Sequence, residues 1–222
     1  MIRLQLNNYQ FKQTSCIKYL GVIIDEHLNW KEHVTHICGK IKRGIGILSK
    51  LRHFVPTKIL VNLYYTLIYP YLTYSVVAWG NTYDTTVKPI TILQKRAMRI
   101  ILFSDFRDHS NPLFIRLKIL KFPDIIKFQT AIFIHDFHHG NLPCSFDSFF
   151  HLVSSRHNYN TRLASCKSNY SLPSARTNYG KFNIRFSATK IWNSLNEDLR
   201  NFKKVKFKKI LFSEMLDSYC EY

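Results

Sequence analysis

The feature that most constrains the fold is an uncharged run over residues 59–83, in a chain whose formal net charge is +18. A run of this length avoids charge either because it lies in the packed interior of a helical domain or because it crosses a bilayer. Pro70 divides the run, and its tyrosines lie in its middle, whereas membrane helices concentrate Tyr at their two ends. We therefore favour two short buried segments hinged near Pro70, on which the charged flanking segments pack, over a membrane span.

The sequence before this run predicts short strands. Apolar and polar residues alternate from residue 2 to residue 6, which is typical of a half-buried strand. Asn7-Asn8 can form a tight turn, and residues 9–12 can form the return strand of a hairpin. A further strand is predicted over residues 17–24, which include three consecutive β-branched residues.

Helical periodicity begins after this β region. Asn29 and Glu32 are spaced as a capping box, with Asn in the place of Ser or Thr. The apolar residues that follow recur every three or four positions and so form one face: Val34, Ile37, Ile41, Ile45 and Leu48. Further helices are predicted from Pro56, from Pro89 through Leu102, and over residues 113–120, 124–137 and 206–219, whereas residues 145–187 are expected to be mostly irregular.

The balance of charge is the main indication of a partner. The chain contains 32 Lys and Arg against 14 Asp and Glu, and this excess would repel itself unless a polyanion bound to it. Nucleic acid is the first candidate, an anionic membrane surface is the second, and a basic surface without a ligand is the remaining alternative. The five cysteines are far apart and form no CxxC pair, which fits a reducing, intracellular compartment and argues against a zinc knuckle.

Five blocks of the sequence carry a resemblance to a known family. They are KYLGVIID at residues 18–25, continued by Leu28, Trp30 and His33; YPYLTY at 69–74 with WG at 79–80; LQKRAMR at 93–99; HNYNTR at 157–162; and IWNSL at 191–195. In this order, and over almost the whole chain, the blocks resemble the non-LTR (LINE-type) retrotransposon reverse transcriptases, particularly their jockey-like branch.

Together with the predicted elements, this resemblance implies a fold and a division of the chain. The fold would be mainly α with a short N-terminal β-hairpin (α+β), and a helical thumb-like bundle would be followed by a mixed, mostly helical C-terminal region. Residues 1–25 would be the primer-grip hairpin that follows the catalytic palm, residues 26–110 the thumb, and residues 111–222 the C-terminal region.

The resemblance also implies nucleic-acid contacts. Tyr19, Leu20 and Gly21 would be remnants of the primer grip, in which Gly21 allows close approach of the backbone; the alternative is an ordinary strand edge. A protein that holds a duplex regardless of sequence needs Lys and Arg on one face of rigid elements, where they contact phosphates. The expected phosphate contacts lie on the helix after Trp30 and on the helix led by Pro89: Lys40, Lys42, Arg43, Lys50, Arg52, Lys95, Arg96 and Arg99.

Two later segments have alternative interpretations. His157, Tyr159 and Arg162 could stack on and clamp single-stranded RNA. Alternatively, Tyr159 is buried and Arg162 donates hydrogen bonds to loop carbonyls. The lysines of residues 203–209 form either a solvated face or a further nucleic-acid contact.

The sequence holds no catalytic centre of the kind that polymerisation requires. That reaction needs paired metal ions held by clustered carboxylates, which the family places in a FADD or YADD motif, and no Asp-Asp pair occurs in the 222 residues. We therefore expect no polymerase or nuclease activity and no cofactor in this chain, since the divalent metal belongs to the palm. Asp105 and Asp108 are expected in a polar loop, and His135, His138 and His139 at a solvated helix end rather than at a metal.

These observations predict a fragment of a retrotransposon RNA-directed DNA polymerase without palm or endonuclease. The fragment would retain binding of the template–primer, which is RNA or an RNA–DNA hybrid. It could act in trans with a complete reverse transcriptase, in the nucleus or the cytoplasm and away from membranes. The alternative is a non-enzymatic remnant or a domesticated interaction scaffold whose basic surface has no evolved nucleic-acid ligand.

Overall fold

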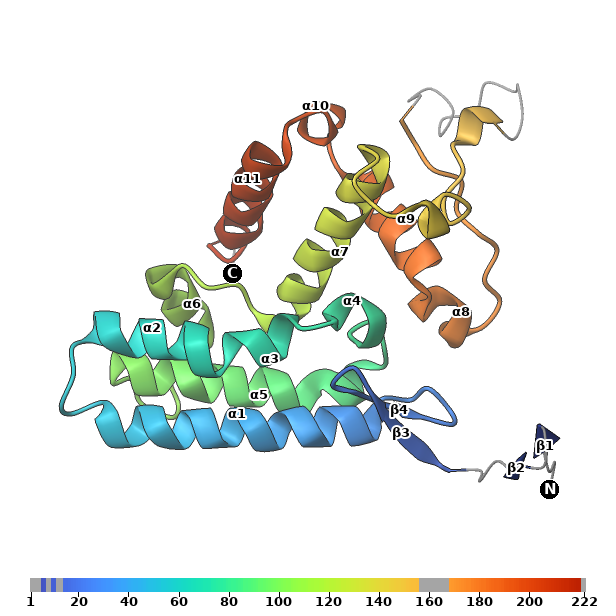
Figure 1. The fold of residues 1–222 in the computed structure, drawn as a ribbon. Helices are drawn as coiled ribbons and strands as arrows, with labels where there is room; N and C mark the ends of the chain where they lie inside the picture. Colours follow the sequence, from blue (N-terminus) through green and yellow to red (C-terminus); the bar gives the residue numbers. More distant parts are fainter. Residues whose placement is uncertain (1–4, 7–8, 11–13, 156–167, 221–222) are drawn as a thin grey trace.

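The computed structural model describes residues 5–6, 9–10, 14–155 and 168–220 of the chain. Short antiparallel hairpins come first and helices follow, so the predicted α+β class is confirmed. The lower layer in Figure 1 is formed by α1 (Lys31–Leu51), α2 (Thr57–Leu67), α3 (Tyr69–Thr73) and α5 (Asp84–Leu102). Within it, α1 and α5 lie side by side, and α7 (Phe122–His138) leads from this layer to the C-terminal helices.

Two hairpins precede the helices. In the first, β1 (Gln5–Leu6) pairs with β2 (Tyr9–Gln10), as predicted. The single strand predicted over residues 17–24 is wrong, because β3 (Cys16–Tyr19) and β4 (Val22–Asp25) form a second hairpin. Leu20 and Gly21 make its two-residue turn with φ values of 43° and 82°, and positive φ at both positions matches the twist of paired strands.

The start of α1 is fixed by Asp25, at the end of β4. Its side chain is 8% exposed and accepts hydrogen bonds from the backbone N–H groups of His27, Asn29 and Trp30 at 2.9–3.1 Å. Burial alone would raise the pKa of Asp25, but these three donors outweigh burial and lower the pKa. The predicted capping box is therefore wrong: the helix begins at Lys31, and Asn29 accepts only from the Lys31 N–H, at 3.1 Å.

The uncharged run is three helices rather than two buried segments. The helix α2 is followed by α3 and by α4 (Val76–Trp79), and the breaks lie at Ile68 and Ser75. Only one stripe is buried, at spacings of three and four: Leu60, Tyr64, Ile68, Leu72, Val76 and Trp79. The other side exposes tyrosines, and none of the described helices is long and apolar enough to span a membrane.

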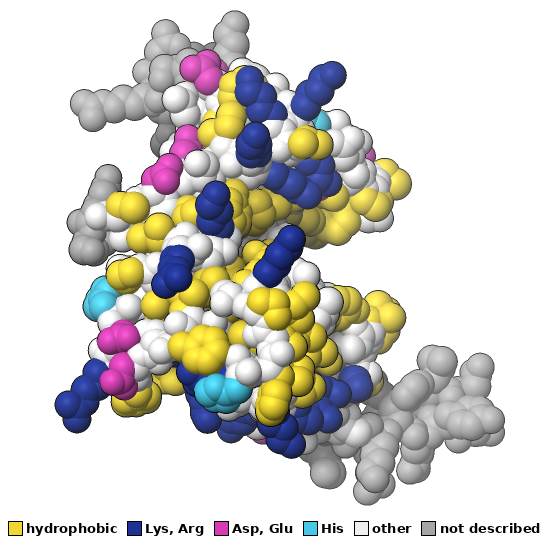
Figure 2. All heavy atoms as spheres, turned by 90° about the vertical axis from the view of Figure 1, so that its left-hand side faces the viewer, with side chains coloured by type: hydrophobic (Ala, Val, Ile, Leu, Met, Phe, Trp, Pro, Cys, Tyr) yellow, Lys and Arg dark blue, Asp and Glu magenta, His cyan; other side chains and the backbone are white. Residues whose placement is uncertain are grey.

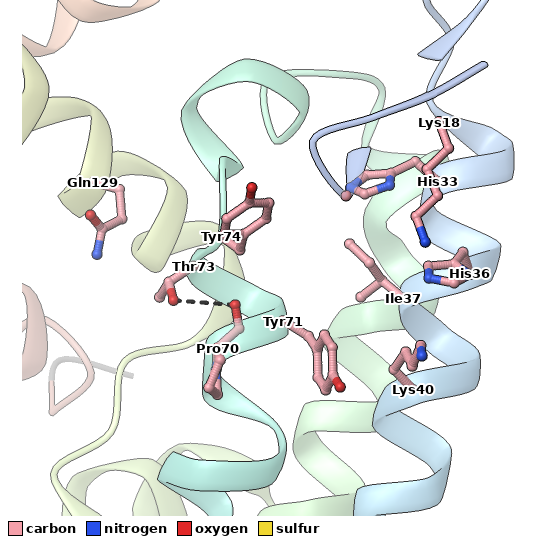
Figure 3. A pocket seen from close by; sticks show the side chains of 11 residues that line it. Lys18, His33, His36, Ile37, Lys40, Pro70, Tyr71, Thr73, Tyr74 and Gln129 are labelled. Carbon is pink, nitrogen blue, oxygen red and sulfur yellow. Dashed lines mark hydrogen bonds between the residues drawn. The ribbon is translucent and has the colours of Figure 1, made fainter. Parts of the chain in front are cut away.

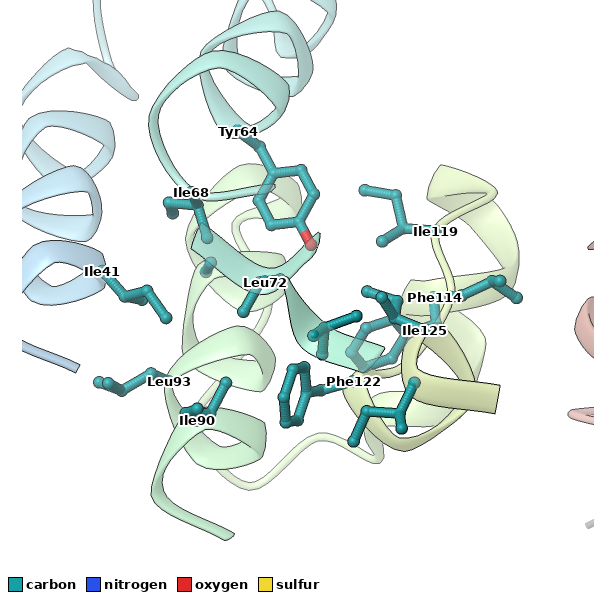
Figure 4. Packing of buried hydrophobic residues seen from close by; sticks show 14 of the residues in the cluster. Ile41, Tyr64, Ile68, Leu72, Ile90, Leu93, Phe114, Ile119, Phe122 and Ile125 are labelled. Carbon is teal, nitrogen blue, oxygen red and sulfur yellow. The ribbon is translucent and has the colours of Figure 1, made fainter. Parts of the chain in front are cut away.

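The main core lies between α1, α2, α3, α5 and α7 (Figure 4). The predicted apolar face of α1 is confirmed, since every one of its five residues is buried. Gln94 is fully buried at its centre, where its amide donates to the Tyr64 hydroxyl and the Leu120 carbonyl and accepts from the Phe122 N–H. The core also includes Phe114, so one cluster spans residue 110, where a domain boundary is predicted.

Two prolines have other positions relative to the helices than the sequence predicts. The helix α5 begins at Asp84, so Pro89 lies inside it, near the N-terminal end, where its missing N–H removes a single helical hydrogen bond. Pro123 lies between the ranges 113–120 and 124–137 that are predicted to be helical, but it belongs to the first turn of α7, where no helical N–H bond is needed. The preceding helix, α6 (Ser110–Leu117), ends instead at Leu117, and the next residue, Lys118, has a φ of 52°.

The C-terminal part has a second, smaller core. Ile134, Phe150, Tyr170, Ala188 and Trp192 bring α7 together with α9 (Ile184–Ser194) and the Leu152–Tyr170 bridge. The remaining elements are η1 (Cys144–Phe146), η2 (Val153–Ser155), α8 (Asn178–Phe182), α10 (Glu197–Arg200) and α11 (Lys204–Asp217). The closing helix is thus confirmed as α11, with Phe207 and Leu211 buried, while the segment predicted to be irregular contains short helices.

Candidate nucleic-acid interface

A basic groove runs between α1 and α5. Lys42, Gly46 and Lys50 line it from α1, and Arg96 lines it from α5, around a volume of about 270 Å³. Buried Ile45 and Leu93 form its floor, so the packing of the two helices holds the cations in place. Figure 2 shows Lys and Arg side chains gathered along the lower edge of the molecule, at the height of α1 and α5 in Figure 1.

The electrostatic environment of this groove is positive. Lys42, Lys50 and Arg96 are exposed, and no described Asp or Glu lines the groove. None of the three forms a salt bridge with a carboxylate of the residues that the structure describes. Arg43 is exposed on the same side of α1, three residues before Gly46 and seven before Lys50, and therefore extends the basic face. Cations that have no neighbouring carboxylate can bind an external anion without first breaking a salt bridge.

Three of the other predicted phosphate contacts lie away from the groove. The Arg52 guanidinium packs over the Phe103 ring at 4.3 Å, beyond the end of α1. Arg99, in the last turn of α5, donates a hydrogen bond at 2.9 Å to the carbonyl of Asp108, which lies in the loop after α5. Lys95 lies near Lys121, whose pKa is lowered by burial and by this neighbouring charge. Lys95 and Arg99 therefore lie in other surroundings than Arg96, although all three belong to α5.

The predicted primer-grip residues form the exposed tip of the second hairpin. Tyr19 and Leu20 are 62% and 72% exposed, and the Tyr74 hydroxyl donates to the Leu20 carbonyl at 2.6 Å. This contact fixes the turn against the residue that follows α3, and Gly21 faces the Tyr74 ring, where an added Cβ would lie 3.4 Å from the ring. Gly21 and Lys40 line a second cavity, of about 670 Å³, between the turn, α1 and α3 (Figure 3).

The C-terminal candidates divide into two groups. His157, Tyr159 and Arg162 lie outside the described residues. In the lysine cluster, Lys204 pairs with Asp136 at 2.6 Å and Lys206 lies 3.8 Å from the Phe202 ring centroid, while Lys203 and Lys209 are exposed.

Two buried histidines, His33 and His135, make contacts that stabilise the fold. His33 is 2% exposed, and its Nδ1 accepts a hydrogen bond from the Ile23 N–H at 3.2 Å. Burial, together with the charge of His36, lowers the pKa of His33 to about 4, so its ring is neutral at pH 7. His135 is stacked on Phe207 and bonds the Phe202 carbonyl rather than lying at a solvated helix end. Within the described part of the chain, no three His, Cys, Asp or Glu side chains are grouped as metal ligands.

Several residues of the larger cavity are not among the predicted site residues. Lys18, His36, Tyr71 and Tyr74 line it together with Lys40. A signal was present, because Tyr71 and Tyr74 are three positions apart and share one side of a helical segment. The sequence does not reveal the hydrogen bond between Tyr74 and Leu20 that brings the hairpin turn to this helical segment.

Comparison with known proteins gives matches to retrotransposon polymerases. The chain is 25% identical over 122 residues to the RNA-directed DNA polymerase from mobile element jockey of Drosophila melanogaster, a match that covers 54% of this chain and 13% of that protein. It is 27% identical over 94 residues to the probable RNA-directed DNA polymerase from transposon X-element of the same fly, covering 40% and 10%. The jockey polymerase of Drosophila funebris is 26% identical over 125 residues, covering 55% and 14%.

These matches confirm the predicted resemblance to non-LTR retrotransposon reverse transcriptases. The matched part is at most 14% of the length of these relatives. No family model and no solved structure matches the chain.

Proposed function

We propose that this chain binds the backbone of a template–primer, RNA or an RNA–DNA hybrid, through the groove between α1 and α5. The observation that carries the proposal is that Lys42, Lys50 and Arg96 meet in one groove without a described carboxylate beside them. The similarity to RNA-directed DNA polymerases supports a nucleic acid as the polyanion.

The composition of the groove favours phosphate over base recognition. Lys42, Lys50 and Arg96 are long cationic side chains, which neutralise phosphates and release counterions whatever the base sequence. Gly46 lies among them, and an added Cβ there would meet no atom within 4 Å. A glycine in the middle of a helix costs about 1 kcal/mol relative to Ala, so open space above it is consistent with close approach of a ligand backbone. The binding should therefore be strong at low salt and weakly selective for sequence.

The carboxylates and metal ions that polymerisation requires would belong to residues outside this sequence. The 222 residues contain no Asp-Asp pair that could hold two catalytic metal ions. We expect no primer extension by the purified chain on an RNA template in the presence of Mg²⁺. Extension above the level of a heat-inactivated sample would overturn this part of the proposal.

Fluorescence anisotropy with a labelled RNA–DNA hybrid tests the binding. The double variant Lys42→Glu/Arg96→Glu should weaken binding by tenfold or more, because it replaces two phosphate contacts with two repulsive charges. The matched control is Lys190→Glu/Arg176→Glu, which makes the same change of charge at exposed positions on α9 and before α8. An equal loss in both variants would show a diffuse charge effect, and no binding by the wild type would favour the interaction-scaffold alternative.

A further inference from the structure

The cavity between α1 and α3 combines cationic and aromatic walls. Lys18, from β3, and His36 and Lys40, from α1, form one wall. Tyr71 of α3 and Tyr74, which directly follows α3, form the other (Figure 3). Its volume of about 670 Å³ lies within the range of small-molecule sites, which is about 300–1,000 Å³. The cavity is therefore large enough for a ligand of its own.

The charge of this cavity selects an anion. No Asp or Glu is among the described residues that line it. Burial, together with the charges of Lys40, Lys18 and Arg43, lowers the pKa of His36, as expected where several cations surround one imidazole. A neutral His36 still offers a hydrogen bond, while Lys18 and Lys40 supply the positive charge that a phosphate needs.

The aromatic wall selects a flat ligand group. Tyr71 and Tyr74 are 38% and 55% exposed, and the Tyr71 ring lies between α3 and α1 on the side of Lys40 (Figure 3). The Tyr74 hydroxyl is engaged by the Leu20 carbonyl, which holds that ring in place at the cavity. Exposed tyrosine rings beside lysines are typical of sites where a base stacks and its phosphate is neutralised.

The cavity is also connected to the basic groove. Arg43 follows Lys40 by three positions on α1 and is exposed, so the two side chains are neighbours on the helix surface. Arg43 in turn precedes Lys50 of the groove by seven positions, on the same side. A strand whose phosphates follow the groove can thus reach the cavity.

We propose that this cavity binds one unpaired nucleotide, with its phosphate against Lys18 and Lys40 and its base against Tyr71. The claim that this nucleotide belongs to a strand held in the groove rests on the proposed function. The claim that the cavity binds a nucleotide is independent of the proposed function.

Adenosine 5′-monophosphate is the probe for the first step, compared with adenosine and with inorganic phosphate by ligand-observed NMR titration. The wild type should bind the nucleotide about tenfold more tightly than either part alone. Tyr71→Ala should lose about tenfold in affinity, Tyr71→Phe should retain it, and Lys40→Gln should reduce binding of the nucleotide but not of adenosine. The control is Tyr65→Ala, which removes a comparably exposed tyrosine of α2 that does not line the cavity.

Two results would overturn the cavity site. One is the same nucleotide affinity in the wild type and in Tyr71→Ala. The other is equal binding of phosphate and nucleotide, which would show an anion site without base recognition.

A second experiment distinguishes this proposal from the proposed function. The wild type should prefer a hybrid with a one-nucleotide overhang over a blunt hybrid by several-fold, and Tyr71→Ala should lose the preference while still binding the blunt hybrid. Binding of both hybrids without preference would refute the unpaired-nucleotide site and leave the groove intact. Binding of adenosine 5′-monophosphate without any hybrid binding would refute the groove and leave the cavity.

Discussion

The basic residues of α1 and α5 and those of the C-terminal part have different surroundings. In the groove, Lys42 and Arg96 are exposed and make no salt bridge with a described carboxylate. In the C-terminal part, Arg200 is 3% exposed and donates to the Leu195 carbonyl at 2.7 Å and to the Asn169 side chain at 2.8 Å. Lys204 likewise pairs with Asp136 at 2.6 Å. The same residue types thus leave their charges open to solvent in the groove, whereas Arg200 and Lys204 use theirs inside the molecule.

This difference shows why net charge alone does not locate a binding surface. A charge of +18 counts every Lys and Arg equally, including cations whose hydrogen bonds are used inside the molecule. Only cations that keep their donors directed to solvent can neutralise phosphates without first breaking internal bonds. Substitutions that separate stability from binding test the comparison directly.

The largest effect is expected from the pair Arg200→Met and Arg96→Met. Arg200→Met should lower the free energy of unfolding by about 3 kcal/mol or more, because it leaves buried carbonyl and amide acceptors without a donor. Arg96→Met should change it by less than about 0.5 kcal/mol, since the side chain is exposed. Urea unfolding followed by circular dichroism measures both values.

The affinity for the hybrid should be affected in the reverse order, more by Arg96→Met than by Arg200→Met. Under conditions where both variants are folded, Arg96→Met should bind the hybrid several-fold more weakly, and Arg200→Met should bind like the wild type. If Arg200→Met proved as stable as the wild type and bound more weakly, the division between structural and ligand-binding cations would fail.

A second effect concerns His33, a buried titratable residue at the base of the larger cavity. Its pKa of about 4 in the folded state lies below the unfolded value of 6.5, so the unfolded state takes up the proton first as the pH falls. The free energy of unfolding should therefore fall by up to about 3 kcal/mol between pH 6.5 and pH 4. In His33→Gln, which keeps an acceptor for the Ile23 N–H, this decrease should be smaller.

The measurement for His33 is urea unfolding at half-unit steps of pH. The difference between the wild type and His33→Gln isolates this residue from other histidines with a lowered pKa, such as His36 and His135. Identical pH dependence in both proteins would mean that His33 is protonated as easily in the folded chain as in the unfolded one.

The smallest effect is expected from Gly46→Ala. The substitution should raise the free energy of unfolding by about 0.5–1 kcal/mol, because Ala is the better helix former and its Cβ meets open space. Hybrid affinity should fall by a few-fold if the ligand backbone approaches Gly46. Gly39→Ala is the matched control: it should give the same gain in stability, but Gly39 does not line the groove. Equal affinities of both variants would exclude close approach at Gly46.

The sequence predicts faces of helices better than it predicts sites. The apolar face of α1, and the cations opposite to it, follow from helical periodicity alone, and the structure confirms that face. Whether Lys95 or Arg96 meets α1 depends on how α5 crosses it, which local pattern does not encode. The turn at Leu20-Gly21 was missed because Gly21 is the only typical turn residue between its two short strands, so that they resemble one longer strand.

The buried contacts of Gln94 and the larger cavity were beyond sequence reasoning for a related reason. The hydrogen bond from Gln94 to Tyr64 joins residues 30 positions apart, and that from Tyr74 to Leu20 joins residues 54 positions apart. Such pairs depend on the packing of whole elements, and a single polar side chain in the sequence does not reveal its partner.

The salt dependence of hybrid binding tests the central claim most directly. Plots of log affinity against log salt concentration should be steep for the wild type, and Lys42→Gln/Arg96→Gln should make the slope shallower by about 1–2, since each lost phosphate contact removes about 0.9. Lys190→Gln/Arg176→Gln, which removes the same charge elsewhere, should leave the slope unchanged. Equal slopes for both double variants would contradict the assignment of the groove between α1 and α5 as the nucleic-acid interface.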